Sequence, residues 1–399
     1  MRDGWTETTL GEVSLINPEV TSSFKNTDEI IYIDLSSVSA ENGIDTELFR
    51  GTYGEAPGRA RRVVRAQDVL VSTVRPYLRG FALVPEFLDG EVASTGFAVL
   101  RAKPTRALPG LIWAIVGTDE FVDFLMERAT GSSYPAVRSS DVSAYPFRLP
   151  PIEEQRRIVD VVASVDAYID ALQQQVDAAR AARNAVLHEL LTAGGDDWTE
   201  TTLGEVAQWS SGGTPQSGES KYYDGDIPWC VIGDLTEGEV FVTEKQITQE
   251  GLQNSSAKIV QPGAVMIAMY GASIGRTGLV AVPMATNQAI ACALPNVELL
   301  DNLFLLIYLQ TQKTLFVEAG QGAAQPNISQ TVLKRWPIPL PSIAEQKRIV
   351  EIVSSMDDVI QAAERAVVEA KNLRSGLLSD LLSGEHEIPV SYDQLLGAA

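Results

Sequence analysis

Two long stretches of the chain carry apolar residues spaced alternately three and four positions apart, and the second stretch lies 191 positions after the first. Such a strict period of about 3.5 residues is typical of a coiled-coil seam, so we predict two helices that pair with each other. The alternative is two amphipathic helices that each pack on their own globular segment. The predicted seam positions are Ile158, Val162, Val165, Ile169, Leu172, Val176, Ala179, Arg183, Val186 and Leu190 in the first stretch, and Ile349, Val353, Met356, Ile360, Ala363, Val367, Ala370, Arg374, Leu377 and Leu381 in the second.

Each predicted helix has about 40 residues, which corresponds to roughly 60 Å. Proline suits the start of each helix, at Pro150-Pro151 and at Pro341, and glycine suits its end, at Gly194-Gly195 and at Gly384. The first helix runs almost directly into the next segment, which leaves little chain for a return to its starting end. We therefore predict that the two helices pair antiparallel.

The same sequence frame opens and closes both halves of the chain. Trp5–Val13 recurs as Trp198–Val206 with nine identities in nine, and Leu149–Val159 returns as Leu340–Val350. Between these anchors the halves diverge, which indicates a tandem repeat with a shared frame and unlike contents. The predicted parts are a first globular domain (1–150), a first helix (151–195), a second globular domain (196–341), a second helix (342–384) and a C-terminal tail (385–399).

Both globular segments consist of short β-like runs with one helical patch near the end. We therefore predict the α+β class, with two domains of twisted mixed sheet plus helices separated by two long antiparallel coiled-coil helices in a pseudo-two-fold tandem repeat. The predicted strands include 63–64, 69–74, 81–84 and 97–100 in the first domain, and 259–260, 265–270 and 278–281 in the second; the predicted helices are 110–125 and 303–316.

The composition is that of an ordinary soluble globular chain, with 45% hydrophobic residues among 399. Because no apolar run reaches about eighteen residues, no membrane span is expected. Cys230 and Cys292 have no CxxC partner, so we expect buried thiols in a reducing cytoplasm and no zinc site. The net charge of −21 argues against a nucleic-acid partner for the chain as a whole, so the local distribution of charge matters.

One region reverses that charge. From Arg50 to Arg79 there are seven arginines against Glu55 and Asp68, a local balance of +5. Guanidinium groups mixed with an aromatic residue suit contacts to phosphates and to guanine edges. The alternative for any one arginine is a solvated loop or an acidic partner, and for the loop 271–276 it is a plain tight turn. The candidate DNA-binding residues are Arg59, Arg61, Arg62, Arg65, Thr73, Arg75, Tyr77 and Arg79 in the first domain, and Lys221, Tyr222, Tyr270, Ser273 and Arg276 in the second.

Catalytic motifs are missing from the sequence. There is no Walker loop, and Asn17-Pro18-Glu19 is not the Asn/Asp-Pro-Pro-aromatic tetrad of adenine methyltransferases. The two histidines, His188 and His386, lie in a predicted helix and in the tail, where neither completes a nucleophilic triad. We therefore predict a protein that is not an enzyme and binds no cofactor or metal of its own.

These motifs resemble the specificity (S) subunits of type I restriction-modification systems over essentially the whole chain. The most specific marks are Trp-x-x-x-x-Leu-Gly-Glu-Val at the start of both halves and Leu-Pro-Pro/Ser-Ile-x-Glu-Gln-x-Arg-Ile-Val at the end of both variable segments. Two features depart from the pattern. The first half has Tyr134-Pro135-Ala136-Val137 where the second has Gln325-Pro326-Asn327-Ile328, and the isoelectric point is unusually acidic.

The resemblance implies two target-recognition domains, each recognising one half of a bipartite site in double-stranded DNA. It implies that the helices set the spacer and dock two methyltransferase (M) subunits, with motor-nuclease (R) subunits joining for cleavage. S-adenosylmethionine, ATP and Mg²⁺ would then act on those partners, which would also supply much of the positive field around the DNA. The alternative is a non-catalytic scaffold or an acidic DNA-mimicking antirestriction decoy, against which the Arg50–Arg79 cluster argues.

Overall fold

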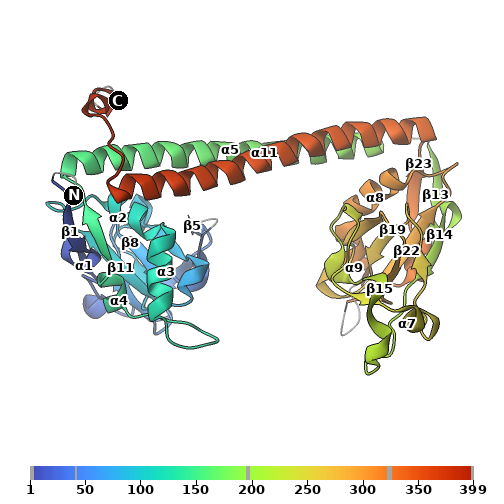
Figure 1. Ribbon diagram of the computed structural model, residues 1–399, viewed down its shortest axis with the longest axis horizontal. Helices are drawn as coiled ribbons and strands as arrows, with labels where there is room; N and C mark the ends of the chain where they lie inside the picture. Colours follow the sequence, from blue (N-terminus) through green and yellow to red (C-terminus); the bar gives the residue numbers. More distant parts are fainter. Residues whose placement is uncertain (1–3, 41–42, 195–197, 321–325, 397–399) are drawn as a thin grey trace. The chain divides into compact units, whose positions relative to one another are not determined.

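The computed structural model of the protein describes residues 4–40, 43–194, 198–320 and 326–396, so Gly195 and Gln325 lie outside the described residues. The chain divides into two compact units. Unit 1 combines Met1–Gln174 with Glu364–Ala399, and unit 2 is Gln175–Ala363. Each unit therefore contains one globular domain and about half of each long helix (Figure 1).

The domain of unit 1 contains two four-stranded sheets, in the orders β6-β3-β10-β7 and β2-β11-β8-β9. The first sheet is mixed, because β10 runs parallel to β3 and antiparallel to β7. The small pair β1-β12 joins the two ends of the domain sequence, so the repeated frame closes on itself. The elements are β1 Thr6–Thr9, α1 Leu10–Val13, β2 Ser14–Ile16, β3 Glu29–Ile33, β4 Val38–Ser39, β5 Gly43–Ile44, β6 Phe49–Thr52, β7 Ala60–Val63, β8 Val69–Ser72, β9 Phe81–Leu83, β10 Val92–Ser94, β11 Phe97–Ala102, α2 Pro109–Val116, α3 Asp119–Arg128, α4 Ser139–Ser143 and β12 Pro146–Leu149.

The domain of unit 2 repeats this plan with a five-stranded sheet, β14-β22-β19-β20-β16, and a four-stranded sheet, β17-β15-β21-β18. Here the pair β13-β23 joins the two ends of the domain sequence. The elements are β13 Thr199–Thr202, α6 Leu203–Val206, β14 Ala207–Ser211, β15 Tyr223–Cys230, β16 Glu239–Val240, β17 Gln246–Ile247, α7 Gln249–Gln253, β18 Ile259–Val260, β19 Val265–Ala268, β20 Thr277–Val280, β21 Met284–Thr286, β22 Ile290–Pro295, α8 Asn302–Thr311, α9 Lys313–Gly320, α10 Gln330–Lys334 and β23 Pro337–Leu340.

The helical patch predicted in each domain is two helices rather than one. In the first domain α2 ends before Gly117, and α3 begins after Thr118, whose hydroxyl accepts a hydrogen bond from the Phe121 amide at 3.2 Å. In a continuous helix this amide would donate to a backbone carbonyl one turn earlier. Because it donates to the Thr118 hydroxyl instead, Thr118 is the N-cap of a new helix. In the second domain the break falls at Gln312, between α8 and α9.

The long helices are α5, Ile152–Thr192, and α11, Ile343–Ser383, and they lie antiparallel within each unit (Figure 1). In unit 1, Arg374 of α11 forms an ion pair with Asp166 of α5. In unit 2, Arg183 of α5 donates two hydrogen bonds to Asp357 of α11, at 2.8 and 3.1 Å. The predicted antiparallel pairing is thus confirmed, and the two polar positions of the seam form ion pairs between the helices.

These ion pairs also explain the direction of pairing. Arg183 and Arg374 are repeat counterparts, as are Asp166 and Asp357, each pair 191 positions apart. A parallel alignment in register would bring counterparts together and would place two guanidinium groups against each other in the seam. The antiparallel alignment instead brings each arginine to an aspartate. A polar residue at a seam position commonly specifies orientation in this way.

The seam changes character near its ends, where each helix also packs on a globular domain. Ile158 and Val162 of α5 belong to the core of the first domain, together with Leu378 and Leu381 of α11. In the second domain the core includes Leu187 of α5 beside Ile349 and Val353 of α11. Both predicted alternatives therefore hold in part, because the helices pair with each other and also pack on the domains.

Contact with the domains shifts the buried position by one residue. Leu187 and Leu378 are buried, whereas the predicted seam residues Val186 and Leu377 are only half-buried. The 3.5-residue pattern cannot anticipate this shift, because the buried surface near the ends is a domain and not the partner helix.

The described part of the tail, 385–396, folds back onto the start of α5 within unit 1. Arg157 donates hydrogen bonds to Asp393 at 2.6 and 3.1 Å, and the Tyr392 hydroxyl donates to Asp160 at 2.6 Å. Ile388 is buried in the core of the first domain, just before the short helix α12, Asp393–Leu396. Within the described ranges, no helix has the length and apolar character that a bilayer crossing needs.

Candidate nucleic-acid interface

The connection from β8 to β9 in the first domain has the same backbone shape as the connection from β19 to β20 in the second. We call these connections tip loop 1 (73–80) and tip loop 2 (269–276). Each contains a short 3-10 turn, Pro76–Leu78 in tip loop 1 and Gly271–Ser273 in tip loop 2. The sequences of the two loops share almost nothing, so the common shape comes from the frame around them.

Two positions in each tip loop adopt the left-handed backbone conformation. In tip loop 1 these are Arg75, with φ 49°, and Arg79, with φ 50°. In tip loop 2 the equivalent positions are Gly271, with φ 67°, and Gly275, with φ 80°. A residue with a Cβ atom costs about 1–2 kcal/mol in this conformation, whereas glycine adopts it freely. Tip loop 1 therefore places arginine where its own backbone favours glycine.

A second segment holds each tip loop in place through the same two hydrogen bonds. In the first domain the Arg75 amide donates to the Pro135 carbonyl at 2.7 Å, and the Val137 amide donates to Thr73 at 2.9 Å. In the second, the Gly271 amide donates to Pro326 at 3.0 Å, and the Ile328 amide donates to Met269 at 2.9 Å. The departure at Tyr134–Val137 thus changes side chains but leaves the backbone pairing intact.

Backbone hydrogen bonds place further candidate residues of the first domain close to tip loop 1. The Thr95 amide donates to the Arg59 carbonyl, and the Thr73 amide donates to the Gly96 carbonyl, both at 2.8 Å. The turn between β10 and β11 thus lies between Arg59 and tip loop 1. Thr73 is nearly buried, and its hydroxyl also donates to Gly96, so it shapes the edge rather than facing a ligand.

Arg75 has the side chain best placed for a ligand. Its guanidinium lies over the ring of Tyr134, 4.3 Å from the centroid, and Tyr134 itself is 68% exposed. Among the described residues it has no carboxylate partner, and its Nε atom is buried without a hydrogen bond. In the same part of the chain, its terminal nitrogens make one long hydrogen bond, 3.5 Å to the Ser133 carbonyl. The exposed Tyr77 lies two positions further along tip loop 1.

Arg79 and Arg65 are engaged within the fold. Arg79 donates to the Gly117 carbonyl at 3.0 Å and pairs with Asp119 at the start of α3. Arg65 pairs with Glu19 at 2.9 Å and approaches Asp89 at 3.7 Å. Hydrogen bonds from Arg65 and Arg101 hold the pKa of Glu19 below its usual value. Both predicted DNA contacts therefore have acidic partners in this structure, the alternative already open from the sequence.

The two arginines of β7, Arg61 and Arg62, differ from each other. Arg61 is exposed, donates to the Tyr53 hydroxyl at 2.7 Å and reaches the Gly58 carbonyl at 3.1 Å. Arg62 is half-buried, and its Nε atom has no hydrogen-bond partner in the described part of the chain. Burial lowers the pKa of Arg62. Arg59 is exposed directly before β7, so Arg59, Arg61, Arg62 and Arg75 are four cations of the first domain without a carboxylate partner among the described residues.

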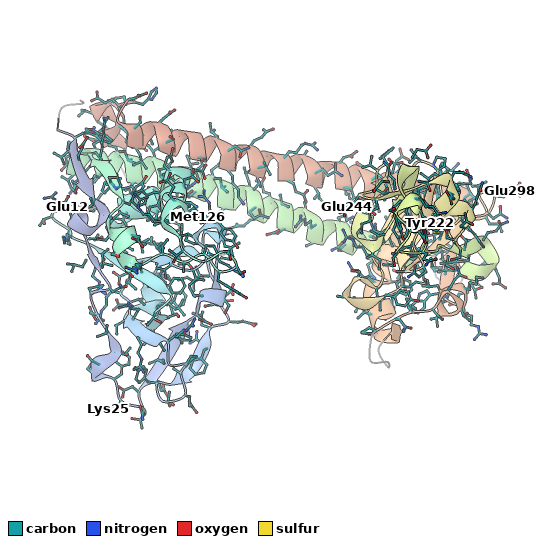
Figure 2. All side chains as sticks on the ribbon, turned by 60° about the horizontal axis from the view of Figure 1, so that its bottom comes forward. Glu12, Lys25, Met126, Tyr222, Glu244 and Glu298 are labelled. Carbon is teal, nitrogen blue, oxygen red and sulfur yellow. The ribbon has the colours of Figure 1, made fainter. Side chains whose placement is uncertain are left out.

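The second domain offers fewer cations. Lys221 pairs with Glu250 and lies 5.2 Å from the ring centroid of Tyr222, which Figure 2 labels. Tyr270 is exposed at the start of tip loop 2. Arg276 ends that loop half-buried, its amide donating to the Ser273 carbonyl at 2.9 Å, and its guanidinium has no ion pair within the described residues. Arg276 is therefore the tip-loop cation of this domain.

Tyr134 is a functional candidate that the sequence pattern alone did not predict. A signal was present, because Tyr134 opens the segment Tyr134–Val137, where the first half departs from Gln325–Ile328 of the second. Its importance lies in supporting Arg75, a residue 59 positions away, and such a contact cannot be inferred from spacing.

The structure offers little for covalent or metal chemistry. No group of three potential metal ligands occurs among the residues described. Burial raises the pKa of Cys230 to about 12 and that of Cys292 to about 11, so both thiols stay protonated at neutral pH. Two cavities lie where the long helices meet the domains, one of about 700 Å³ beside Leu187 and Tyr308 and one of about 230 Å³ beside Tyr145 and Leu382.

The fold and these loops define a class of two-domain recognition proteins. Each domain has the same loop framework but carries different side chains on it, and both units share the two long helices. The family model for the type I restriction modification DNA specificity domain matches residues 195–370. The chain is also 21% identical over 465 residues to the HindI specificity subunit of Haemophilus influenzae, a match that covers 96% of this chain and 99% of that one.

Solved structures agree with this assignment. A chain from a study of complex assembly and conformational transition of the type I R-M system is 27% identical, with a TM-score of 0.64 and coverage of 96% of this chain and 98% of that one. The S subunit from M. genitalium, at 14% identity and a TM-score of 0.52, has the same fold. Residues 195–370 thus match the type I restriction modification DNA specificity domain, and almost the whole chain is similar to a type I specificity subunit, which confirms the resemblance seen in its sequence.

Proposed function

We propose that this protein gives a type I restriction-modification complex its DNA sequence specificity, with each domain recognising one half of a bipartite site. The observation that carries the proposal is the pair of tip loops. They have one backbone shape and one set of supporting hydrogen bonds, but their residues differ at equivalent positions, Arg75 against Gly271 and Tyr77 against Ser273. A constant frame with variable side chains suits the recognition of two different half-sites.

We further propose that two methyltransferase subunits dock on the long helices. Tyr168 of α5 is 59% exposed, and its repeat counterpart Val359 of α11 is 62% exposed. Each unit thus presents an exposed apolar side chain at the same position of the repeat, which supports two equivalent partners. S-adenosylmethionine, ATP and Mg²⁺ would bind to the methyltransferase and motor-nuclease subunits, and this chain would catalyse nothing itself.

The acidic charge is compatible with this role if the partners surround the DNA. The net charge of −21 belongs to the whole chain, whereas the tip of the first domain carries cations without acidic partners among the described residues. The long helices would then set the spacing between the half-sites. The competing function, an acidic decoy that mimics DNA, does not use such a cluster of arginines.

The test is to map methylated bases in cells that express the chain with its methyltransferase partner. We expect a bipartite motif, no methylation by the purified chain alone with S-adenosylmethionine, and activity when the partner is added. Replacing residues 14–148 by those of a relative should change the first half-site and leave the second unaltered. Turnover by the single chain, or a change in both half-sites at once, would contradict the proposal.

A further inference from the structure

The side chain of Arg75 is not required by the fold of the loop that carries it. Arg75 has the left-handed conformation in which glycine is most at ease, and tip loop 2 builds the same turn with Gly271. The hydrogen bonds that hold the turn come from the backbone in both domains. A residue held in an unfavourable backbone region that its surroundings enforce is often a functional one.

Arg79, the other left-handed arginine of tip loop 1, provides the contrast. Its guanidinium is engaged by the Gly117 carbonyl and the Asp119 carboxylate, so its side chain stabilises the start of α3. Arg75 has no carboxylate partner in the described part of the chain. Arg75 and Arg79 therefore share the left-handed backbone conformation, but within the described residues only the guanidinium of Arg79 is paired with a carboxylate.

The ring of Tyr134 fixes the plane of the Arg75 guanidinium. Stacking at 4.3 Å holds the planar group from one face and leaves its edge uncovered by the ring. An oriented guanidinium loses less conformational freedom when it binds, because its plane is already set. Tyr134 is exposed and Arg75 is half-buried, so the stacked pair lies at the border of the protein surface.

Resting on the proposed function, we propose that Arg75, braced by Tyr134, determines specificity in the first half-site by recognising a guanine. Guanine presents O6 and N7 as two adjacent acceptors in the major groove, and the two-pronged edge of a guanidinium matches them. Gly271 cannot make this contact, so the equivalent position of the second domain recognises no base by a side chain. One base pair of the first half-site therefore depends on one residue.

The experiment uses the complex of the full chain with its methyltransferase partner, and reads the motif from methylated DNA. The central variant is Arg75→Gly, which removes the guanidinium but gives the turn the residue its backbone favours. We expect one guanine of the first half-site to become degenerate, with roughly a 5- to 150-fold loss of discrimination at that position. The thermal stability should not fall, and the second half-site should stay the same.

Two further variants separate recognition from structure. Arg79→Gly is the matched control, because it relieves the same strain but removes the contacts to Gly117 and Asp119; it should lower thermal stability and leave the motif unchanged. Arg75→Lys keeps the positive charge but lacks the paired N–H donors of a guanidinium. This variant should therefore retain affinity for DNA and lose the preference for guanine.

The outcomes are distinct. If Arg75→Gly keeps the motif of the parent complex with undiminished preference at every position, the inference about Arg75 is wrong while the proposed function stands. A uniform loss of binding to all DNA sequences by a folded Arg75→Gly variant also overturns it, because that result assigns Arg75 to a phosphate. If the parent complex itself yields no bipartite motif, the proposed function fails first.

Discussion

Removing the ion pair between Arg183 and Asp357 should cost the protein more stability than removing an ordinary surface pair. The two side chains are 16% and 41% exposed, so the pair is partly shielded from water. At an effective dielectric constant of about 20, unit charges about 4 Å apart attract by about 4 kcal/mol. Desolvation and the ordering of both side chains offset much of this attraction, which leaves an expected coupling of about 1–2 kcal/mol.

The measurement is a double-mutant cycle on the purified chain, with Arg183→Ala, Asp357→Ala and the double variant, and urea unfolding of the whole chain as the readout. The matched control is the pair Arg156–Glu153 on α5, at a similar 2.8 Å but with side chains 58% and 62% exposed. That pair should contribute about 0.3–0.5 kcal/mol, because water screens both charges. The difference between the two cycles isolates the effect of the seam.

A charge swap extends the test to the direction of pairing. Arg183→Asp alone places two carboxylates in the seam and should destabilise the helices, whereas Arg183→Asp with Asp357→Arg should restore most of the loss. A coupling energy for Arg183–Asp357 no larger than that of the exposed control would refute the argument. It would mean that the apolar positions alone determine how α5 and α11 pair.

Three further predictions concern the helices, the thiols and the tail. Inserting four residues near Arg183 adds about 6 Å of helix and should lengthen the spacer of the methylated motif by a base pair or two; an active variant with the original spacer would exclude the helices as the ruler. A thiol reagent at pH 8 should label neither Cys230 nor Cys292 until urea unfolds the chain, since burial raises both pKa values to about 11 or 12; mass spectrometry of the native protein would reveal any early labelling. The hydrogen bond from Arg157 holds the pKa of Asp393 below its usual value, so docking of the tail should be complete above the ordinary aspartate pKa and should be lost as the pH falls through the lowered pKa of Asp393. Limited proteolysis at neutral pH should cut the tail of the Asp393→Asn variant, and equal protection of the variant and the parent protein would contradict this.

The sequence pattern was sufficient for the parts of the fold that depend on periodicity. The spacing of Ile158, Val162 and their successors predicts α5 and α11, and the position of the repeated frame predicts their direction. The break at Thr118 could also have been inferred, because Thr-Asp-Glu is a typical start of a helix. The shift from Val186 to Leu187 could not, because it depends on a domain surface that no local pattern encodes.

The candidate site was less predictable, because charge in a sequence does not reveal its partner. The sequence does not distinguish Arg65, Arg75 and Arg79 from one another. Only the folded chain places Asp119 beside Arg79 and Tyr134 beside Arg75. The left-handed conformation at Arg75 is equally hidden, since arginine is not a residue that marks such a turn. The region could be predicted from its composition, whereas the role of each arginine required the contacts.

The division of the long helices between the two units has a consequence for how the chain is made. Unit 2 is one continuous segment, but unit 1 needs residues 364–399 to complete the pairing of the first half of α5. At a synthesis rate of about 5–20 residues per second, the roughly 210 residues that separate Gln174 from the end of α11 at Ser383 take about 10–42 s to emerge. During that interval the apolar stripe around Ile169 has no partner helix on the ribosome. A nascent chain stalled in this window should therefore bind a chaperone, or the same stripe of a neighbouring nascent chain, far more readily than the finished protein does.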